Sequence, residues 1–250
     1  MGLMSRARER LTASLRGADI LPSPNIWHWP DVYEAENRAQ DVDGDLWRLL
    51  DGVADWTGDV LDVGCGDGFH LARFARTASS VLGVEPHPPL VERARARVAG
   101  LDGVAAVLGS AQALPVPDAA YDVVHARTAY FFGPGCEPGL READRVLRPG
   151  GALVIVDLDA ARAPYGRWMR ADLPTYDSAK VDKFFELAGF ERHRVATRWR
   201  FADRGALEAV LRIEFSAAVA ARAINEVDGL EFPVGYRVLV RRKPTGLILG

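Results

Sequence analysis

The sequence predicts an α/β fold with a doubly wound, mostly parallel sheet. Between residues 59 and 158, short apolar segments alternate with segments whose apolar residues recur at helical spacing. The strand segments are almost continuously apolar, which is typical of parallel strands that are buried on both faces. A chain of 250 residues, 48% of them hydrophobic, is long enough for one such domain with a small insertion.

The parallel part of the sheet is expected to hold five strands. They are predicted at residues 60–63, 79–85, 104–108, 121–126 and 152–158. Helices are expected at residues 31–50, 88–99 and 137–147, and another follows the first strand with Leu71, Ala72, Phe74 and Ala75 on one face. The sequence Pro149-Gly150-Gly151 is expected to stop the helix that precedes the fifth strand.

The last third of the chain has a different pattern. A helix is expected at residues 178–188 and a long strand at 190–201, followed by a helical insertion at about 204–228 that breaks near Glu214. A final strand at 231–241 alternates apolar residues with arginines. Two strands joined by a compact helical insertion suit an antiparallel hairpin at the edge of the sheet.

The N-terminal region is predicted to form a helical arm and lid, residues 1–45, ahead of a single domain at 46–250. Residues 1–17 place apolar side chains four apart between arginines, which predicts a short amphipathic helix. We expect this helix to pack on its own domain; a membrane-surface role is the weaker alternative because of Glu9 and the small apolar face. Residues 21–30 hold three prolines and are predicted to be extended or turn.

A glycine-rich turn after the first strand indicates a ligand site. Gly64, Gly66 and Gly68 alternate between a buried strand and a helix. Residues without Cβ let the backbone approach a ligand, and the first turn of a helix presents unpaired N–H groups. The turn lacks the lysine of a P-loop, and Phe69 occupies the third glycine position of a dinucleotide fingerprint. A tight turn with no ligand is the alternative.

An acidic residue ends the second predicted strand. Glu85 lies 21 residues after Gly64. In open α/β sheets, ligands bind beyond the carboxyl ends of the strands, and an acidic residue about 20 residues after the glycine turn accepts hydrogen bonds from ribose hydroxyls. The pattern therefore predicts a nucleoside ligand, and a solvated glutamate at a strand end is the alternative.

Residues 62–68 have the pattern D-x-G-x-G-x-G, which resembles motif I of the class I S-adenosylmethionine-dependent methyltransferases (methyltransferase type 11 or UbiE-like group). Further similarity lies in the Ala-Leu-Pro-x-Pro-Asp segment at 113–118, in the Tyr-Asp-Val-Val segment at 121–124 and in residues 142–153. The resemblance covers about residues 46–158. It implies a Rossmann-like, seven-stranded, mostly parallel sheet with an antiparallel edge hairpin, and S-adenosyl-L-methionine as cofactor in a methyl-transfer reaction.

The same resemblance implies which residues hold the cofactor. Asp62 would meet the methionine ammonium group, the N–H groups of the glycine turn its carboxylate, and Glu85 the ribose. Serine stands at position 110, where family members commonly carry an acidic residue that receives the adenine amino group; its hydroxyl can accept the same hydrogen bond. The expected cofactor-binding residues are Asp62, Gly64, Cys65, Gly66, Gly68, Glu85, Pro86, Ser110, Ala111 and Gln112.

Residues after the fourth strand are candidates for the chemistry. A neutral oxygen or nitrogen acceptor needs a positioned base to remove its proton. His125 ends the fourth predicted strand, where the family lines its transfer pocket, and is the candidate catalytic residue; a pocket wall or core position is the alternative. Tyr130 and Phe131 follow in the next loop and are expected to contact the substrate, or else to fold into the core.

Aromatic residues also cluster ahead of the first strand. Trp27, His28 and Trp29 are consecutive in the proline-rich segment, and Tyr33 follows. Placed before a nucleotide-binding fold, they predict a lid that contacts the substrate. A hydrophobic strap that holds the N-terminal arm to the core explains them equally well, so both interpretations stay open.

Composition narrows the classes of partner. The net charge of −3 argues against a protein that works mainly by coating phosphate backbones. The chain also lacks the N/D-P-P-Y/F motif with which amino-methylating enzymes grip a flipped base. We expect a small-molecule acceptor and no nucleic acid. The alternatives are a protein or tRNA methyltransferase and a non-catalytic cofactor-binding subunit; a dehydrogenase is disfavoured by Phe69.

The two cysteines and the hydropathy of the chain indicate whether a metal, a disulfide or a membrane segment is expected. Cys65 and Cys136 have neither metal-site nor disulfide spacing, so no metal is expected. No apolar run reaches the length of a transmembrane helix, and no secretory segment opens the chain. We therefore expect a soluble cytoplasmic protein, monomeric or homodimeric, that does not bind membranes.

Overall fold

The computed structural model describes residues 23–130 and 133–246. The predicted helix at 1–17 and the substrate candidate Phe131 lie outside these residues. The chain divides into two compact units. The helical unit comprises residues up to Arg48, Leu158–Ser178 and Arg194–Tyr236, and the sheet unit comprises Leu49–Asp157, Ala179–His193 and the residues from Arg237 on. The expected boundary near residue 45 stays a prediction.

The strands form one seven-stranded sheet in the order β3-β2-β1-β4-β5-β7-β6. They are β1 (Asp59–Val63), β2 (Ser80–Glu85), β3 (Val104–Leu108), β4 (Tyr121–Arg127), β5 (Leu147–Leu158), β6 (Glu191–Arg200) and β7 (Glu231–Arg242). Strands β1 to β5 pair in parallel. β7 runs antiparallel to β5, because Gly150 N donates to Lys243 O while Asp159 N donates to Gly235 O. The predicted fold class is confirmed, and the order reverses direction between β1 and β4.

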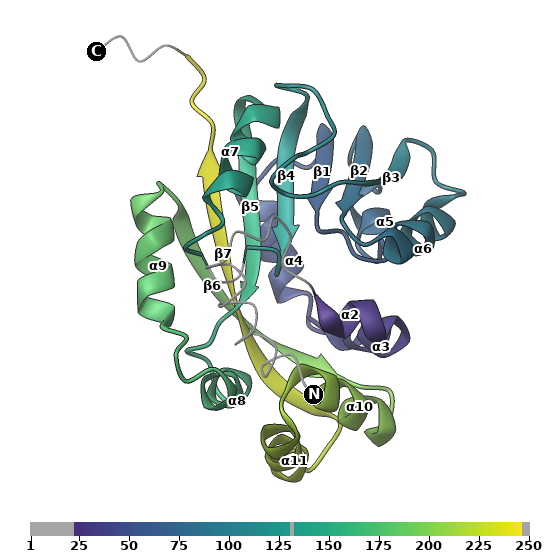
Figure 1. Cartoon of the computed structure of the whole chain (residues 1–250), viewed down its shortest axis with the longest axis vertical. Helices are drawn as coiled ribbons and strands as arrows, with labels where there is room; N and C mark the ends of the chain where they lie inside the picture. Colours follow the sequence, from purple (N-terminus) through teal and green to yellow (C-terminus); the bar gives the residue numbers. More distant parts are fainter. Residues whose placement is uncertain (1–22, 131–132, 247–250) are drawn as a thin grey trace. The chain divides into compact units, whose positions relative to one another are not determined.

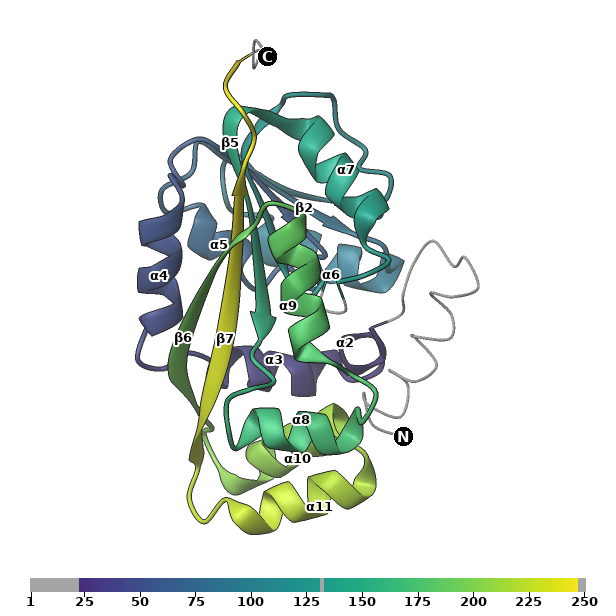
Figure 2. The same ribbon diagram turned by 90° about the vertical axis from the view of Figure 1, so that its left-hand side faces the viewer.

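Helices cover both faces of the sheet unit. They are α4 (Asp45–Val53), α5 (Leu71–Phe74), α6 (Pro88–Val98), α7 (Glu137–Val146) and α9 (Ser178–Leu187). Neighbouring residues of β7 point to opposite faces: the guanidinium of Arg242 donates to Val53 O at the end of α4, and that of Arg241 donates to Ala188 O just after α9. Figure 2 shows α4 and α9 on opposite sides of β7, while α5 and α6 lie beside β1–β3 (Figure 1).

The turn before β5 differs from the expectation. Residues 149–151 were expected to stop the preceding helix and to form a tight turn into the fifth strand. The helix does end ahead of them, at Val146, but β5 already begins at Leu147 and runs through them. The strand persists because Gly150 N donates to Lys243 O and Lys243 N donates to Gly151 O, both at 2.8 Å. Gly150 has a φ of +85°, which a glycine adopts without strain. Pairing with β7 therefore makes these residues part of a strand where a turn was expected.

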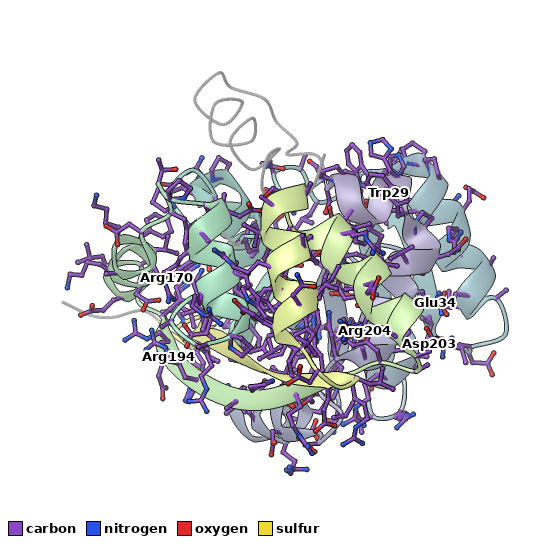
Figure 3. The ribbon with its side chains drawn as sticks, turned by 90° about the horizontal axis from the view of Figure 1, so that it is seen from below. Trp29, Glu34, Arg170, Arg194, Asp203 and Arg204 are labelled. Atoms are coloured by element: carbon purple, nitrogen blue, oxygen red, sulfur yellow. The ribbon has the colours of Figure 1, made fainter. Side chains whose placement is uncertain are left out.

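Helices dominate the other unit. It contains α2 (Pro24–His28), α3 (Pro30–Ala39), α8 (Tyr165–Asp172), α10 (Arg204–Glu214) and α11 (Ala217–Glu226). The predicted break of the insertion near Glu214 is confirmed. Asp203 caps α10 by accepting from Ala206 N at 2.8 Å, and the neighbouring Arg204 donates to Ile224 O at the end of α11 (Figure 3). A cation on the last carbonyls of a helix stabilises that end.

Two predictions for the N-terminal segments are wrong. Residues 24–28 were expected to be extended but form α2, and the segment expected as one helix at 31–50 is two helices, α3 and α4. Pro24 and Pro30 each occupy the first position of a helix, where no backbone N–H is needed. Asp41 separates α3 from α4 with a φ of +50°, and its carboxylate accepts from Leu46 N and Trp47 N.

Large aromatic residues form the core of the helical unit. Tyr165 and Trp168 of α8 pack against Phe215 and Phe232, and Trp199 donates from Nε1 to the hydroxyl of Tyr236 at 2.8 Å. All six side chains are at most 3% exposed. None of the helices in the described residues is both long and apolar enough to span a bilayer.

Candidate functional site

The glycine turn has the backbone conformation that its sequence predicts. Gly64, Gly66 and Gly68 have φ values of +74°, +59° and +79°, which disfavour any side chain. Gly64 N donates to Val84 O at 2.8 Å, which ties the turn to β2. A Cβ on Gly68 would lie 3.1 Å from Ala94 Cα, so the turn packs directly on α6. The turn is thus a fixed backbone surface with no side chains from its three glycines.

Glu85 braces this turn. It ends β2 and is 4% exposed. Its Oε2 accepts from Gly66 N at 3.1 Å, and its Oε1 accepts from His87 N at 3.1 Å. A carboxylate only accepts hydrogen bonds, which is the chemistry that a ribose hydroxyl needs from its partner. The sequence predicted a ligand contact for Glu85, but not that it joins the turn to the start of α6.

A buried ion pair holds the turn from the other side. Asp67 is 2% exposed, and its Oδ2 accepts from Arg97 Nη2 at 2.6 Å. Arg97 Nε also donates to Asp67 O at 3.0 Å, so one guanidinium fixes both the side chain and the backbone of the turn. Sequence reasoning missed this pair, because Arg97 is one of several arginines on α6 and nothing local marks it as the partner.

Asp62 and His125 form a second buried pair, close to the carboxyl ends of β1 and β4. They are register neighbours on adjacent strands, and His125 Nδ1 lies 2.7 Å from Asp62 Oδ1. Asp62 is 3% exposed and His125 is 0% exposed. The imidazole packs at 4.9 Å from the Phe74 ring and 6.1 Å from the Trp56 ring, measured between centroids. Because β4 continues to Arg127, His125 lies inside the strand and not at its end.

Burial and nearby charges shift the pKa values of two side chains in and next to the glycine turn, Cys65 and His70. Burial, followed by the charges of Asp62, Glu85 and Asp67, raises the pKa of the Cys65 thiol well above its ordinary value, so Cys65 is a neutral small side chain. Burial and the nearby Arg127 guanidinium lower the pKa of His70 well below its ordinary value. Arg127 therefore brings positive charge near the turn, and no pattern in the sequence had singled it out. Within residues 23–130 and 133–246, no three His, Cys, Asp or Glu side chains converge as metal ligands.

The predicted adenine segment follows β3 at the same end of the sheet. Gly109 N donates to Glu85 O at 3.1 Å, so this segment starts beside the end of β2 and Pro86. Ser110, Ala111 and Gln112 are half-buried, and Ser110 O accepts from Ala113 N at 3.2 Å. The structure thus brings the glycine turn, Glu85 and this segment together.

Tyr130, one of the expected substrate contacts, is packed inside the sheet unit. Tyr130 is 4% exposed, and its hydroxyl donates to Gly139 O at 3.4 Å, so the ring packs against the first turn of α7. Burial raises the pKa of Tyr130, which is therefore a neutral phenol. Its contact with a substrate stays a prediction.

The predicted lid residues all belong to the helical unit. Trp27 and His28 end α2, Trp29 links it to α3, and Tyr33 lies in α3. Trp29 is 39% exposed (Figure 3), and its ring meets that of His28 edge to face at 5.7 Å. The glycine turn belongs to the sheet unit, so a lid over it stays a prediction.

Comparisons with known proteins agree with this geometry. Residues 61–155 match a family model described as a methyltransferase domain. The chain is 40% identical to 27-O-demethylrifamycin SV methyltransferase of Amycolatopsis mediterranei (strain S699) over 262 residues, which cover 90% of this chain and 92% of that protein. It is 32% identical to demethylmenaquinone methyltransferase of Clavibacter sepedonicus over 58% of this chain. The chain spans 62% of that relative and 30% and 49% of two other curated relatives.

Solved structures share the fold. The YcgJ protein of Bacillus subtilis superposes with a TM-score of 0.59 at 19% identity, covering 80% of this chain and 98% of that one. The (4+2)-cyclase SpnF superposes with a TM-score of 0.57 at 26% identity, covering 80% of each chain. A geranyl diphosphate methyltransferase in complex with S-adenosylmethionine gives 0.53 at 15% identity, over 79% of this chain and 83% of that one.

Proposed function

This chain belongs to the S-adenosylmethionine-dependent methyltransferases, and we propose that it transfers the methyl group of this cofactor to a small-molecule acceptor. The observation that supports the acceptor class is the 40% identity to the rifamycin methyltransferase across 90% of the chain. The family model covers only residues 61–155. Similarity that extends over the remaining residues therefore includes segments outside the shared cofactor-binding part, where acceptor specificity would lie.

The residues of the glycine turn fit the proposed cofactor. Three glycines with positive φ carry no Cβ that would keep a ligand away from the backbone of the turn, which suits close approach of the methionine end of the cofactor. The Glu85 carboxylate is an acceptor suited to the hydroxyls of a ribose, and the Asp62 carboxylate suits an ammonium group. The bound cofactor would supply an already activated methyl group.

The protein's own contribution would then be to bind, orient and exclude water. The turn, fixed by Glu85 and by the Asp67–Arg97 pair, would present the cofactor in one orientation. A hydroxyl or amine acceptor would also need to lose a proton. His125 is the base expected from the sequence, but its imidazole is fully buried and bonded to Asp62.

We propose a hydroxyl oxygen as the acceptor atom to test first, because the relative matched over 92% of its length is named for an O-demethyl substrate. The experiment incubates the purified protein with trideuteromethyl-labelled cofactor and three separate pools: small molecules, RNA and protein. Label confined to small molecules supports the proposal, and label in RNA or protein supports the macromolecular alternative. We place the reaction in the cytoplasm as part of the same proposal.

A reaction other than methyl transfer is the second candidate. It is favoured by the likeness to the (4+2)-cyclase SpnF at 26% identity over 80% of both chains. A protein of this kind would bind the cofactor or its demethylated product without releasing label to any pool. Calorimetric binding of S-adenosylhomocysteine with no labelled product in any of the three pools would therefore favour it over the methyltransferase proposal.

A further inference from the structure

The Asp62–His125 pair uses only part of each side chain. His125 Nδ1 and Asp62 Oδ1 lie 2.7 Å apart. The other imidazole nitrogen, Nε2, is buried and has no hydrogen-bond partner among the described residues. Asp62 Oδ2 takes no part in the contact with His125. The pair therefore presents one satisfied contact, one carboxylate oxygen outside that contact and one imidazole nitrogen enclosed by protein.

The surroundings select one tautomer of His125. A carboxylate only accepts hydrogen bonds, so the proton of a neutral imidazole lies on Nδ1, toward Asp62. A proton on Nε2 would be a buried donor without a partner beside the rings of Phe74 and Trp56, which is unfavourable. Nε2 is then the nitrogen that could act as a base, but it lies in a fully buried ring. A base must reach the proton that it removes.

We propose that His125 is a positioning residue: it holds the Asp62 carboxylate, through Nδ1–H and Oδ1, in the orientation that receives the ammonium group of the cofactor. This inference rests on the proposed function. It assigns His125 to cofactor binding and not to proton removal from the acceptor. Asp62 is set in β1 and His125 in β4, so the contact also fixes the carboxylate across the point where the strand order reverses.

The test compares two ligands that differ only at the amino-acid end. S-adenosylhomocysteine carries the ammonium group, and 5′-methylthioadenosine has the same nucleoside without it. Their dissociation constants are measured by calorimetry for the wild type, His125→Leu and His125→Asn. Leucine removes the donor, whereas the asparagine amide can place an N–H near the position of Nδ1.

We expect His125→Leu to weaken binding of S-adenosylhomocysteine about tenfold, or about 1.4 kcal/mol, and to leave 5′-methylthioadenosine within about twofold. His125→Asn is expected to restore most of the loss, since a hydrogen bond to an ionised group is worth at least this much. Phe74→Leu is the matched control: it changes the packing of the imidazole without removing the hydrogen bond, so the ratio of the two affinities should stay that of the wild type.

The outcomes separate the inference from the function on which it rests. A wild type that binds neither ligand overturns the proposed function itself. If the wild type binds both ligands, and His125→Leu lowers the two affinities equally or lowers neither, the positioning role alone is overturned. If the Leu variant does not fold, the Asn variant and nitrogen-15 spectra of the wild-type imidazole decide. A proton found on Nε2 with Nδ1 bare would refute the inference.

Discussion

Replacing Glu85 by alanine should impair both the stability of the fold and binding of the cofactor. The carboxylate accepts two backbone hydrogen bonds at 3.1 Å, from Gly66 N and His87 N, on the two sides of the site. Gly66 is buried, so its N–H would lose its partner where water enters least easily, whereas His87 is half-buried and can be rehydrated. A buried donor left without a partner costs about 1–3 kcal/mol.

We therefore expect Glu85→Ala to lower the free energy of unfolding by about 2 kcal/mol, most of it from Gly66. Binding of S-adenosylhomocysteine should weaken further, because the ribose hydroxyls also lose a charged acceptor worth about 1.5–3 kcal/mol. That range corresponds to an affinity roughly ten- to 150-fold lower. The stability and the affinity of Glu85→Gln should lie between those of the wild type and of Glu85→Ala, since the glutamine amide oxygen can still accept one of the backbone hydrogen bonds.

Urea unfolding and calorimetric titration at the same temperature measure the two effects separately. Glu92→Ala is the control: Glu92 is an exposed glutamate of α6 that pairs with Arg95 on the same helix, and its removal should change neither quantity beyond about 0.5 kcal/mol. An alanine variant at position 85 that binds S-adenosylhomocysteine as tightly as the wild type would refute the ribose assignment. A variant that is as stable as the wild type would refute the bracing role.

Three further substitutions test the fold. Gly68→Ala should destabilise by about 1–3 kcal/mol, because φ is +79° and the new Cβ would lie 3.1 Å from Ala94 Cα; Gly52→Ala, with open space around it in α4, should be neutral or slightly stabilising in the same urea assay. Burial raises the pKa of Asp157 to about 6, so its contribution to stability is complete below about pH 4 and is lost as the pH rises to about 6. Relative to Asp157→Asn, the wild type should lose about 3 kcal/mol between pH 4 and pH 7, and a difference that does not change with pH would contradict this. Asp41→Ala should cost about 2 kcal/mol by thermal or urea unfolding, since the carboxylate accepts from two N–H groups at the start of α4 and from a threonine hydroxyl; an unchanged midpoint would show that the cap contributes nothing.

Local patterns in the sequence were sufficient for most of the fold. The apolar strands, the glycine turn and the break of the helical insertion depend on residues close together in the chain, so periodicity and turn chemistry predict them. The same approach failed for α2, because Pro24 and Pro30 were interpreted as helix breakers when each begins a helix. It also failed at residues 149–151, where pairing with the distant Lys243 decides that the backbone is a strand.

The sequence by itself determined that a fixed glycine turn and an acidic strand end meet at one edge of a parallel sheet. Only the tertiary structure decided what holds them. Glu85 bonds to the turn 19 residues before it, Arg97 reaches Asp67 over 30 residues, and His125 meets Asp62 over 63. These partners are chosen by strand register and helix packing, which bring together residues that no local pattern relates. For this reason a histidine expected to remove a proton from the acceptor is found bonded to the carboxylate beside the glycine turn.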